Sequence, residues 1–265
     1  MYDERNILIM TSYERVMTAL SHNNPDRPPV DYIATSEINE KLKRYLNIED
    51  QEELLNYLGV DMHYVNARFI DPKGLVGEPC INSGIRCSDA GKDFWGVERR
   101  SVKYKFGTYS EVTSHPLAHV KTLEEIEEYR WPDMSCFDMS HLKEEIKRIN
   151  DKERHAIIFS AGNTFETQWY MRGLERFLLD LIEYPEIAAA ISRKVAEFCK
   201  ERAMRAIEES DGQIDIIKSS GDLGAQDGMM LSPELWRKYM KQCSGELVKP
   251  FKEMGLKTFY HSCGS

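Results

Sequence analysis

The residues with the clearest potential for chemistry lie at the end of the sequence, where Phe259 to Ser265 read FYHSCGS. His261 and Cys263 are two positions apart, and in an extended chain such residues point to the same face. Imidazole nitrogen and thiolate sulfur are both good zinc ligands, and a catalytic zinc usually has three protein ligands and one open position. The pair therefore predicts a zinc site whose third ligand comes from elsewhere. The spacing alone leaves open a hydrogen-bonded histidine beside a small buried cysteine.

A second candidate is the loop GDLGAQDGMMLSP, which begins at Gly221. It follows a short apolar segment, predicted as a strand over 215–219, and precedes a helix capped by Ser232 with proline at its first position. Asp222 falls at the carboxyl end of that strand, where barrel enzymes carry their catalytic residues. We predict Asp222 as a catalytic and substrate-binding residue and Gln226 as a substrate-binding residue. The alternative is that Asp222 only caps a turn.

A third candidate is Glu166, in the run GNTFE that follows the apolar segment AIIFS at 156–160. It also falls where a strand ends and a helix begins. We predict it as a catalytic residue, either a metal ligand or a base. The alternative is an exposed acid in the first turn of the following helix, where carboxylates are favoured by the helix dipole.

The elements that must position these residues alternate between strands and helices. Five short apolar segments, near residues 30, 60, 156, 215 and 258, predict strands; the first covers 30–34. Long helical patterns separate them, with predicted helices at 167–182, 185–209 and 233–254, the last with an interruption expected near Gly245. Such alternation favours βαβ units and a parallel sheet. Residues 66–115 instead alternate aromatic and charged residues, a pattern that predicts a β-hairpin insertion.

The predicted fold class is α/β, as a TIM-type (β/α)8 barrel. Only about five βα units are visible in 265 residues, whereas a closed barrel needs eight strands. The sequence stops just beyond the fifth predicted strand, so we expect an incomplete barrel that lacks its C-terminal part. The alternative is an open five-stranded sheet that is complete as it stands.

Composition narrows the function classes. The net charge of −9 and pI of about 5.4 make nucleic acid an unlikely partner, because an acidic surface repels phosphates. No apolar stretch is long enough for a signal peptide or a membrane span, so no membrane partner is expected. The six cysteines are irregularly spaced without a CxxC pair, which predicts a cytoplasmic protein without a disulfide framework. Phosphate-binding and nucleophile-elbow motifs are absent.

Segments spread along nearly the whole chain resemble the uroporphyrinogen decarboxylase superfamily. They are TSYERVMTAL with PDRPPV, TLEEIEEYRWPD, MRGLERFLLDLIEYPE, GDLGAQDGMMLSPELW and the final FYHSCGS. The resemblance implies one (β/α)8-barrel domain over 1–265. Members of this family are longer than this chain, so it also implies a missing C-terminal segment.

Two branches of this superfamily differ in chemistry. Decarboxylases carry an Arg-Gln-Ala-Gly-Arg-Tyr motif after the first strand, whose arginines bind the carboxylates of the porphyrinogen. Here the corresponding stretch, 31–38, is DYIATSEI and has no arginine. A substrate with eight carboxylates needs cationic partners, which argues against that activity. Methylcobamide:coenzyme M methyltransferases and their relatives bind zinc through a His-x-Cys pair, matched by His261 and Cys263, and a later cysteine, expected in the missing segment.

The resemblance thus implies a zinc-dependent methyltransferase that moves a methyl group between a corrinoid protein and a thiol or folate acceptor. Asp222 and Glu166 would orient the acceptor or supply a further ligand or proton contact. The alternatives are a cofactor-free uroporphyrinogen decarboxylase of tetrapyrrole biosynthesis and an inactive truncated family member. A homo-oligomer is possible on sequence grounds.

Overall fold

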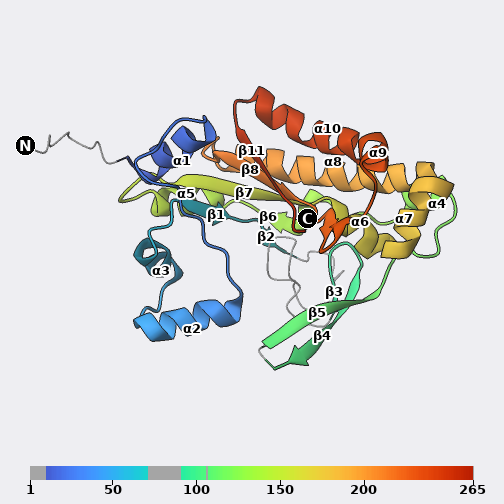
Figure 1. Ribbon diagram of the computed structural model, residues 1–265, viewed down its shortest axis with the longest axis horizontal. Helices are drawn as coiled ribbons and strands as arrows, with labels where there is room; N and C mark the ends of the chain where they lie inside the picture. The colour runs from blue at the N-terminus through green and yellow to red at the C-terminus, as the bar shows by residue number, and fades with distance from the viewer. Residues whose placement is uncertain (1–9, 71–90, 106, 265) are drawn as a thin grey trace, which may run out of the picture.

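The computed structural model describes residues 10–70, 91–105 and 107–264. Its centre is a parallel sheet, which within these residues has four strands in the order β1-β7-β8-β11 (Figure 1). The strands are β1 (Met62–Val65), β7 (Ala156–Asn163), β8 (Ile216–Ser220) and β11 (Lys257–His261). All three pairings are parallel, so the carboxyl ends of the strands meet along one edge. That edge carries the candidate residues.

Helices connect and cover these strands. Those before β7 are α1 (Ser12–Leu20), α2 (Ser36–Leu46), α3 (Gln51–Tyr57), α4 (Leu123–Glu128), the 3-10 turn η1 (Met134–Cys136) and α5 (Leu142–Ile149). Those after it are α6 (Phe165–Arg172), α7 (Leu174–Glu183), α8 (Pro185–Glu209), α9 (Pro233–Leu235), the π-helical turn η2 (Trp236–Met240) and α10 (Lys241–Glu253). Figure 1 shows α8 and α10 running side by side along the sheet.

The two faces of the sheet differ in what covers them. On one face, Ile157, Phe159 and Ile217 are buried in the main apolar core, together with residues of α5, α8 and α10. On the other, Ala156, Ile158 and Ile216 form a smaller cluster with Val16 of α1 and with the partly buried Tyr64. Strand residues alternate between faces, so this second, less covered face also carries Lys218, Ser220 and His261 (the inner face below).

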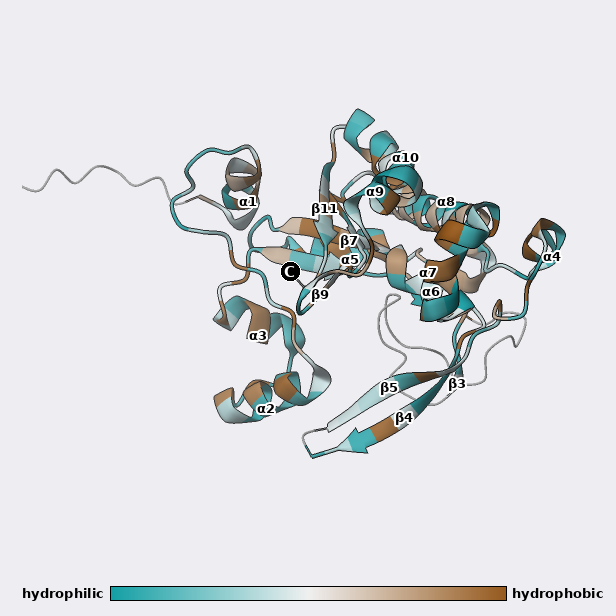
Figure 2. Ribbon diagram, turned by 45° about the vertical axis from the view of Figure 1, so that its right-hand side comes forward, coloured by the Kyte–Doolittle hydropathy of each residue, from teal (hydrophilic) through white to brown (hydrophobic). Residues whose placement is uncertain are grey.

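Smaller sheets flank the parallel one. The strands β3 (Gly91–Lys92), β4 (Glu98–Tyr104) and β5 (Gly107–Ser114) form an antiparallel sheet, and Figures 1 and 2 show β4 and β5 projecting from the body. This confirms the predicted hairpins for 91–114, while 71–90 lie outside the described residues. The pair β2 (Arg68–Phe69) with β6 (Phe137–Asp138) and the hairpin β9 (Gly224–Ala225) with β10 (Gly228–Met229) complete the strands.

The predicted first strand over 30–34 is wrong. The segment joins no strand in the described chain, and a hydrogen bond from the Asp61 N–H to the Val30 carbonyl, at 2.9 Å, links it to the residue before β1. Two prolines precede it and supply no N–H donors. Ile33 is 67% exposed, so its apolar character does not reflect a buried strand.

Two predicted helices are divided differently from the expectation. The helix predicted over 167–182 is broken at Gly173, whose φ of +91° favours glycine. The helix predicted over 233–254 is not interrupted at Gly245, which lies inside α10; its irregular turn is η2. By contrast, α8 runs from Pro185 to Glu209 as predicted.

The sheet does not close on itself within the described residues, so the barrel stays a prediction at this level. Among the helices of the described chain, none combines the length and the apolar character needed to cross a bilayer.

Candidate metal site at the strand ends

The structure brings three of the predicted residues together where β8 and β11 end. His261 is the last residue of β11 and pairs in register with Ser220, the last of β8. The Nε2 atom of His261 lies 3.2 Å from the Sγ atom of Cys263 and 3.7 Å from an Oδ atom of Asp222. One ligand atom from each of these residues lies within 4.8 Å of the other two. We call this set the His-Cys-Asp cluster.

Backbone contacts between the two loops hold this cluster in place. The Gly221 N–H donates to the His261 carbonyl at 3.0 Å, and the Cys263 N–H donates to the Asp222 carboxylate at 2.8 Å. Further along, Gly224 and Gly264 face each other so closely that a Cβ on either would overlap the backbone opposite. The φ of Gly264, +91°, also disfavours other residues. The glycines therefore allow the loops to approach and set the spacing of the ligand atoms.

The donor set fits a zinc ion. Nitrogen, sulfur and carboxylate oxygen are the ligand types that zinc takes in proteins. In a tetrahedral site, bond lengths of about 2.0–2.3 Å put neighbouring ligand atoms roughly 3.3–3.7 Å apart. The observed separation of 3.7 Å lies in this range, and that of 3.2 Å lies just below it. The side chains of His261 and Asp222 are 45% and 38% exposed, so a fourth position is accessible from solvent.

The electrostatics of the cluster favour a cation. The negative charge of Asp222, followed by partial burial and by the charge of Glu166, raises the pKa of the Cys263 thiol above its usual range. Two carboxylates and a thiol are thus close together, and among the described residues only His261 can supply a positive charge within the cluster. A bound divalent cation reverses this balance and favours the thiolate.

Glu166 lies beside the cluster, in the first turn of α6. Its side chain is buried, and its Oε2 atom has no hydrogen-bond partner among the described residues. Burial raises the pKa of its carboxyl, against hydrogen bonds from Asn163 and the Asp222 N–H, and the charge of Asp222 raises it further. The Glu166 N–H donates to Asn163 Oδ1 at 2.9 Å, which fixes this turn. The structure thus excludes the interpretation of Glu166 as an exposed acid and places a buried carboxyl of raised pKa beside Asp222.

Gln226 occupies a different position from the other predicted residues. It lies in the two-residue turn of the β9-β10 hairpin with its side chain exposed, two residues beyond Gly224.

Tyr260 and Asn163 were not predicted as site residues. The Tyr260 hydroxyl donates to the Gly221 carbonyl at 3.3 Å and so supports the loop from the face opposite His261. The signal for Tyr260 was its place between two inner-face residues of a strand.

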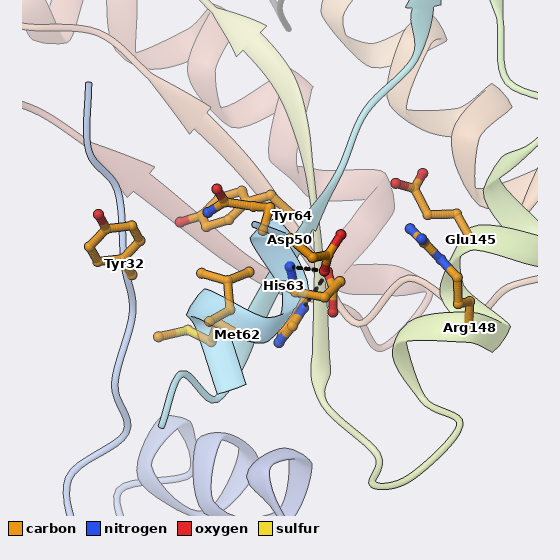
Figure 3. A pocket seen from close by; sticks show the side chains of 10 residues that line it. Tyr32, Asp50, Met62, His63, Tyr64, Glu145 and Arg148 are labelled. Carbon is orange, nitrogen blue, oxygen red and sulfur yellow. Dashed lines mark hydrogen bonds and ion pairs between the residues drawn. The ribbon is translucent and has the colours of Figure 1, made fainter. Parts of the chain in front are cut away.

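A separate pocket of about 330 Å³ opens between α3, β1 and α5. Figure 3 shows His63 at its wall, with Tyr32 on one side and Arg148 and Glu145 on the other. The Nδ1 atom of His63 lies 3.5 Å from a Glu52 carboxylate oxygen. No predicted site residue lines this pocket, which is built around β1 and not around the ends of β8 and β11.

Comparison with known proteins gives a family and a fold. Residues 100–265 match the uroporphyrinogen decarboxylase (URO-D) family. A solved structure of a methyltransferase from Methanosarcina mazei superposes with a TM-score of 0.61 at 15% sequence identity, covering 96% of this chain and 70% of that one. No curated protein matches the chain in sequence.

Proposed function

Because the chain belongs to the uroporphyrinogen decarboxylase family, we propose that it is a zinc-dependent methyltransferase that moves a methyl group from a corrinoid protein to a thiol or folate acceptor. The observation that carries the proposal is the convergence of Asp222, His261 and Cys263 at the ends of β8 and β11. The fold shared with a methyltransferase at TM-score 0.61 is consistent with it.

His261 and Cys263 would hold the zinc ion, and Asp222 would be its third protein ligand. When bound, zinc acts as a Lewis acid that lowers the pKa of a thiol acceptor or positions a folate. Asp222 also accepts a hydrogen bond from the Cys263 N–H. It therefore links the loop after β8 to the loop after β11 and would be a ligand as well. This arrangement would supply three ligands within the described chain, where the family resemblance predicted a later cysteine as the third.

The transfer itself is a displacement at the methyl carbon. The acceptor's thiolate attacks that carbon, and the carbon–cobalt bond of the corrinoid substrate breaks with both electrons left on cobalt, as Co(I). The exposure of His261 and Asp222 leaves the cluster open to a second protein that carries the corrinoid. Glu166, buried and with a raised pKa, would orient the acceptor or supply a proton contact.

Decarboxylation of a porphyrinogen has less support from the chain. Its substrate requires several cationic side chains, and the stretch 31–38 supplies none. The described structure concentrates acidic groups and a thiol at the strand ends. Such a site attracts a cation and repels a polycarboxylate.

Metal analysis tests the proposal directly. After dialysis against zinc and removal of free metal, we expect the wild-type protein to retain about one zinc ion per chain. His261→Ala and Cys263→Ser should each lower the zinc content to below about a tenth of an ion per chain. A catalytic zinc site loses most of its affinity when one of its three protein ligands is removed. Asp222→Asn should lower affinity less strongly, since an amide oxygen is a weaker ligand.

Matched controls are His119→Ala, an exposed histidine, and Cys243→Ser, a half-buried free cysteine of α10. Both should retain the wild-type zinc content. Consumption of methylcobalamin with a thiol or with tetrahydrofolate, followed by its visible spectrum, would then identify the acceptor class. A protein without zinc that decarboxylates uroporphyrinogen would instead establish the second activity of the family.

A further inference from the structure

A buried arginine lies on the face of the sheet that the main apolar core covers. Arg202 belongs to α8, which runs along the sheet (Figure 1), and it is 1% exposed without a carboxylate partner in the described chain. Its guanidinium carbon lies 5.2 Å from the ring centre of Phe137 and 5.4 Å from that of Phe159. Burial lowers the pKa of Arg202 to about 10. A buried cation without a counter-ion is costly, so its N–H groups need acceptors of another kind.

Two backbone carbonyl groups of β7 are those acceptors. The Nη1 atom of Arg202 donates to the Ser160 carbonyl at 3.2 Å and to the Ala161 carbonyl at 3.3 Å. Here β7 has one residue more than β8, because Ser160 and Gly162 pair with consecutive residues of β8 and Ala161 has none opposite. Such an extra residue is a β-bulge, and it disrupts the ladder of backbone hydrogen bonds locally. Arg202 therefore supplies a donor to carbonyl groups at the bulge.

The same face of α8 contacts the bulge at a second point. Cys199 is three residues before Arg202, so the two side chains are neighbours on the helix surface. The Cys199 Sγ atom lies 2.8 Å from the position that a Cβ on Gly162 would take. The φ of Gly162, +142°, is also one that other residues rarely adopt. The bulge is therefore fitted to α8 by packing as well as by hydrogen bonds.

The bulge determines to which face of the sheet Asn163 points. Ser160 lies on the inner face, and in a regular strand a residue three positions later would point to the opposite, covered face. With the extra residue, Asn163 instead pairs in register with Ser220 of the inner face. There its Oδ1 atom accepts the Glu166 N–H at 2.9 Å, and its side chain also forms a hydrogen bond with the Glu166 carboxyl. Asn163 thereby fixes the first turn of α6, with Glu166 beside Asp222.

We propose that Arg202 is a positioning residue of the candidate site, which acts through the bulge of β7 to hold Asn163 and Glu166 beside Asp222. Arg202 lies on the covered face of the sheet, and its contacts are with the backbone of β7 and with aromatic rings. The consequence for methyl transfer rests on the function proposed above. The effect on the bulge does not, and it can be measured without substrate or metal.

Hydrogen exchange of backbone amides, followed by NMR on metal-free protein, tests the link between Arg202 and the site. The N–H groups of Thr164 and Glu166 both form hydrogen bonds just after the bulge, so their exchange rates report its geometry. In Arg202→Met, we expect both to exchange faster by about ten-fold or more relative to the amides of α10, because hydrogen bonds from a charged donor have been lost. Arg202→Lys keeps a charged donor and should restore part of the protection.

Arg205→Met is the matched control, because Arg205 lies on the same helix but is 47% exposed at its side chain and pairs with Glu209. It should leave both exchange rates at their wild-type values. Exchange at Thr164 and Glu166 that is no faster in Arg202→Met than in wild type, relative to α10, would overturn the proposal. If Arg202→Met does not fold, Arg202→Lys decides the question: it should accelerate both amides several-fold, and wild-type rates in it would overturn the proposal equally.

The methyl-transfer reaction supplies a second measurement. Arg202→Met should lower kcat by about ten- to a hundred-fold through misplacement of Glu166, while zinc content stays at the wild-type level. In the background of Asn163→Ala, the same substitution should lower kcat little further, since both changes act on one path; additive losses would contradict this role. If the wild-type chain transfers no methyl group, the proposed function fails, and the exchange rates still decide whether Arg202 positions Asn163 and Glu166.

Discussion

The two ends of the parallel sheet treat charge in opposite ways. At the amino ends of the strands, Asp61 is fully buried and both of its carboxylate oxygens have partners. Nitrogen atoms of Arg15 and Arg27 each lie 2.6 Å from one of them, and the Val30 N–H donates at 2.7 Å. At the carboxyl ends, Asp222 and Glu166 lie close together without an arginine or lysine partner among the described residues. At the amino ends the buried charge is matched within the protein, and at the carboxyl ends the acidic groups have no such match in the described chain.

This contrast separates structural from functional polar groups. A buried carboxylate is costly unless its partners are built in, and the amino end supplies them from α1 and the loop that follows it. The carboxyl end instead leaves a raised pKa at Glu166, and neither the Ser220 hydroxyl nor Lys218 has a polar partner among residues 10–70, 91–105 and 107–264. This contrast is the basis for our expectation that the groups at the carboxyl ends bind a ligand.

The largest change in stability is expected when the buried charge of Asp61, at the amino ends of the strands, is removed. Asp61→Asn should destabilise the protein by about 3–5 kcal/mol, because it leaves Arg15, 5% exposed at its side chain, without one of its two carboxylate partners. Urea denaturation followed by circular dichroism measures the change. Glu111→Gln is the control: Glu111 pairs with Arg100 on the exposed β4-β5 hairpin, and such pairs contribute about 0–1 kcal/mol. Similar losses in both variants would refute the contrast.

The next largest loss of stability is expected at low pH, where Asp61 at the amino ends of the strands becomes protonated. Burial acts to raise the pKa of Asp61, but hydrogen bonds from Arg27, Val30 and Arg15 outweigh it and leave the pKa below its ordinary value. A lowered pKa contributes stability that is present above the unfolded value, about 3.9, and is lost as the pH falls through the folded value. We expect unfolding free energies to fall steeply below about pH 4. The loss of unfolding free energy that acid causes in the wild type should be smaller than the loss that Asp61→Asn causes at neutral pH. In that variant, the free energy of unfolding should depend less on pH in the acid range.

The order of elements was predictable because local patterns determine it. Pro185 begins α8, as the sequence indicated, because proline is favoured in the first turn of a helix. The break at Gly173 was missed because the amphipathic pattern continues across it. The strand predicted over 30–34 is wrong for a different reason. A short apolar run predicts a strand from sequence alone, but whether a neighbouring strand pairs with it depends on the fold.

The candidate site was predictable in its residue types and not in its assembly. The spacing of His261 and Cys263 indicated a shared face, but nothing in the sequence places Asp222 beside them, since that depends on β8 and β11 being neighbours. Lys218 was visible as a lysine within an apolar strand. Its isolation from carboxylates is a property of three strands together, and so appears only in the fold.

A smaller effect is expected at the carboxyl ends of the strands when the buried acid there is neutralised. The pKa of Glu166 is raised by burial, so its contribution to stability is present below the unfolded value and is lost as the pH rises through the folded value. In metal-free protein, Glu166→Gln should therefore be more stable than wild type at pH 7, by about 0.5–1 kcal/mol. The difference should vanish near pH 4. A destabilised variant at pH 7 would mean that the ionised carboxylate has a partner in solution.

The smallest change in stability should come from removing the His-Cys-Asp cluster itself. In metal-free protein, Asp222→Asn and His261→Ala should alter the free energy of unfolding by no more than about 0.5 kcal/mol, because both side chains are well exposed and form no buried ion pair. With zinc present the wild type should gain stability in proportion to its affinity, and His261→Ala should gain none, since only the folded chain brings the ligands together. Thermal denaturation with and without zinc measures both quantities. A large loss in the metal-free variants would instead place these residues among the groups that hold the fold, and the two ends of the sheet would no longer differ in kind.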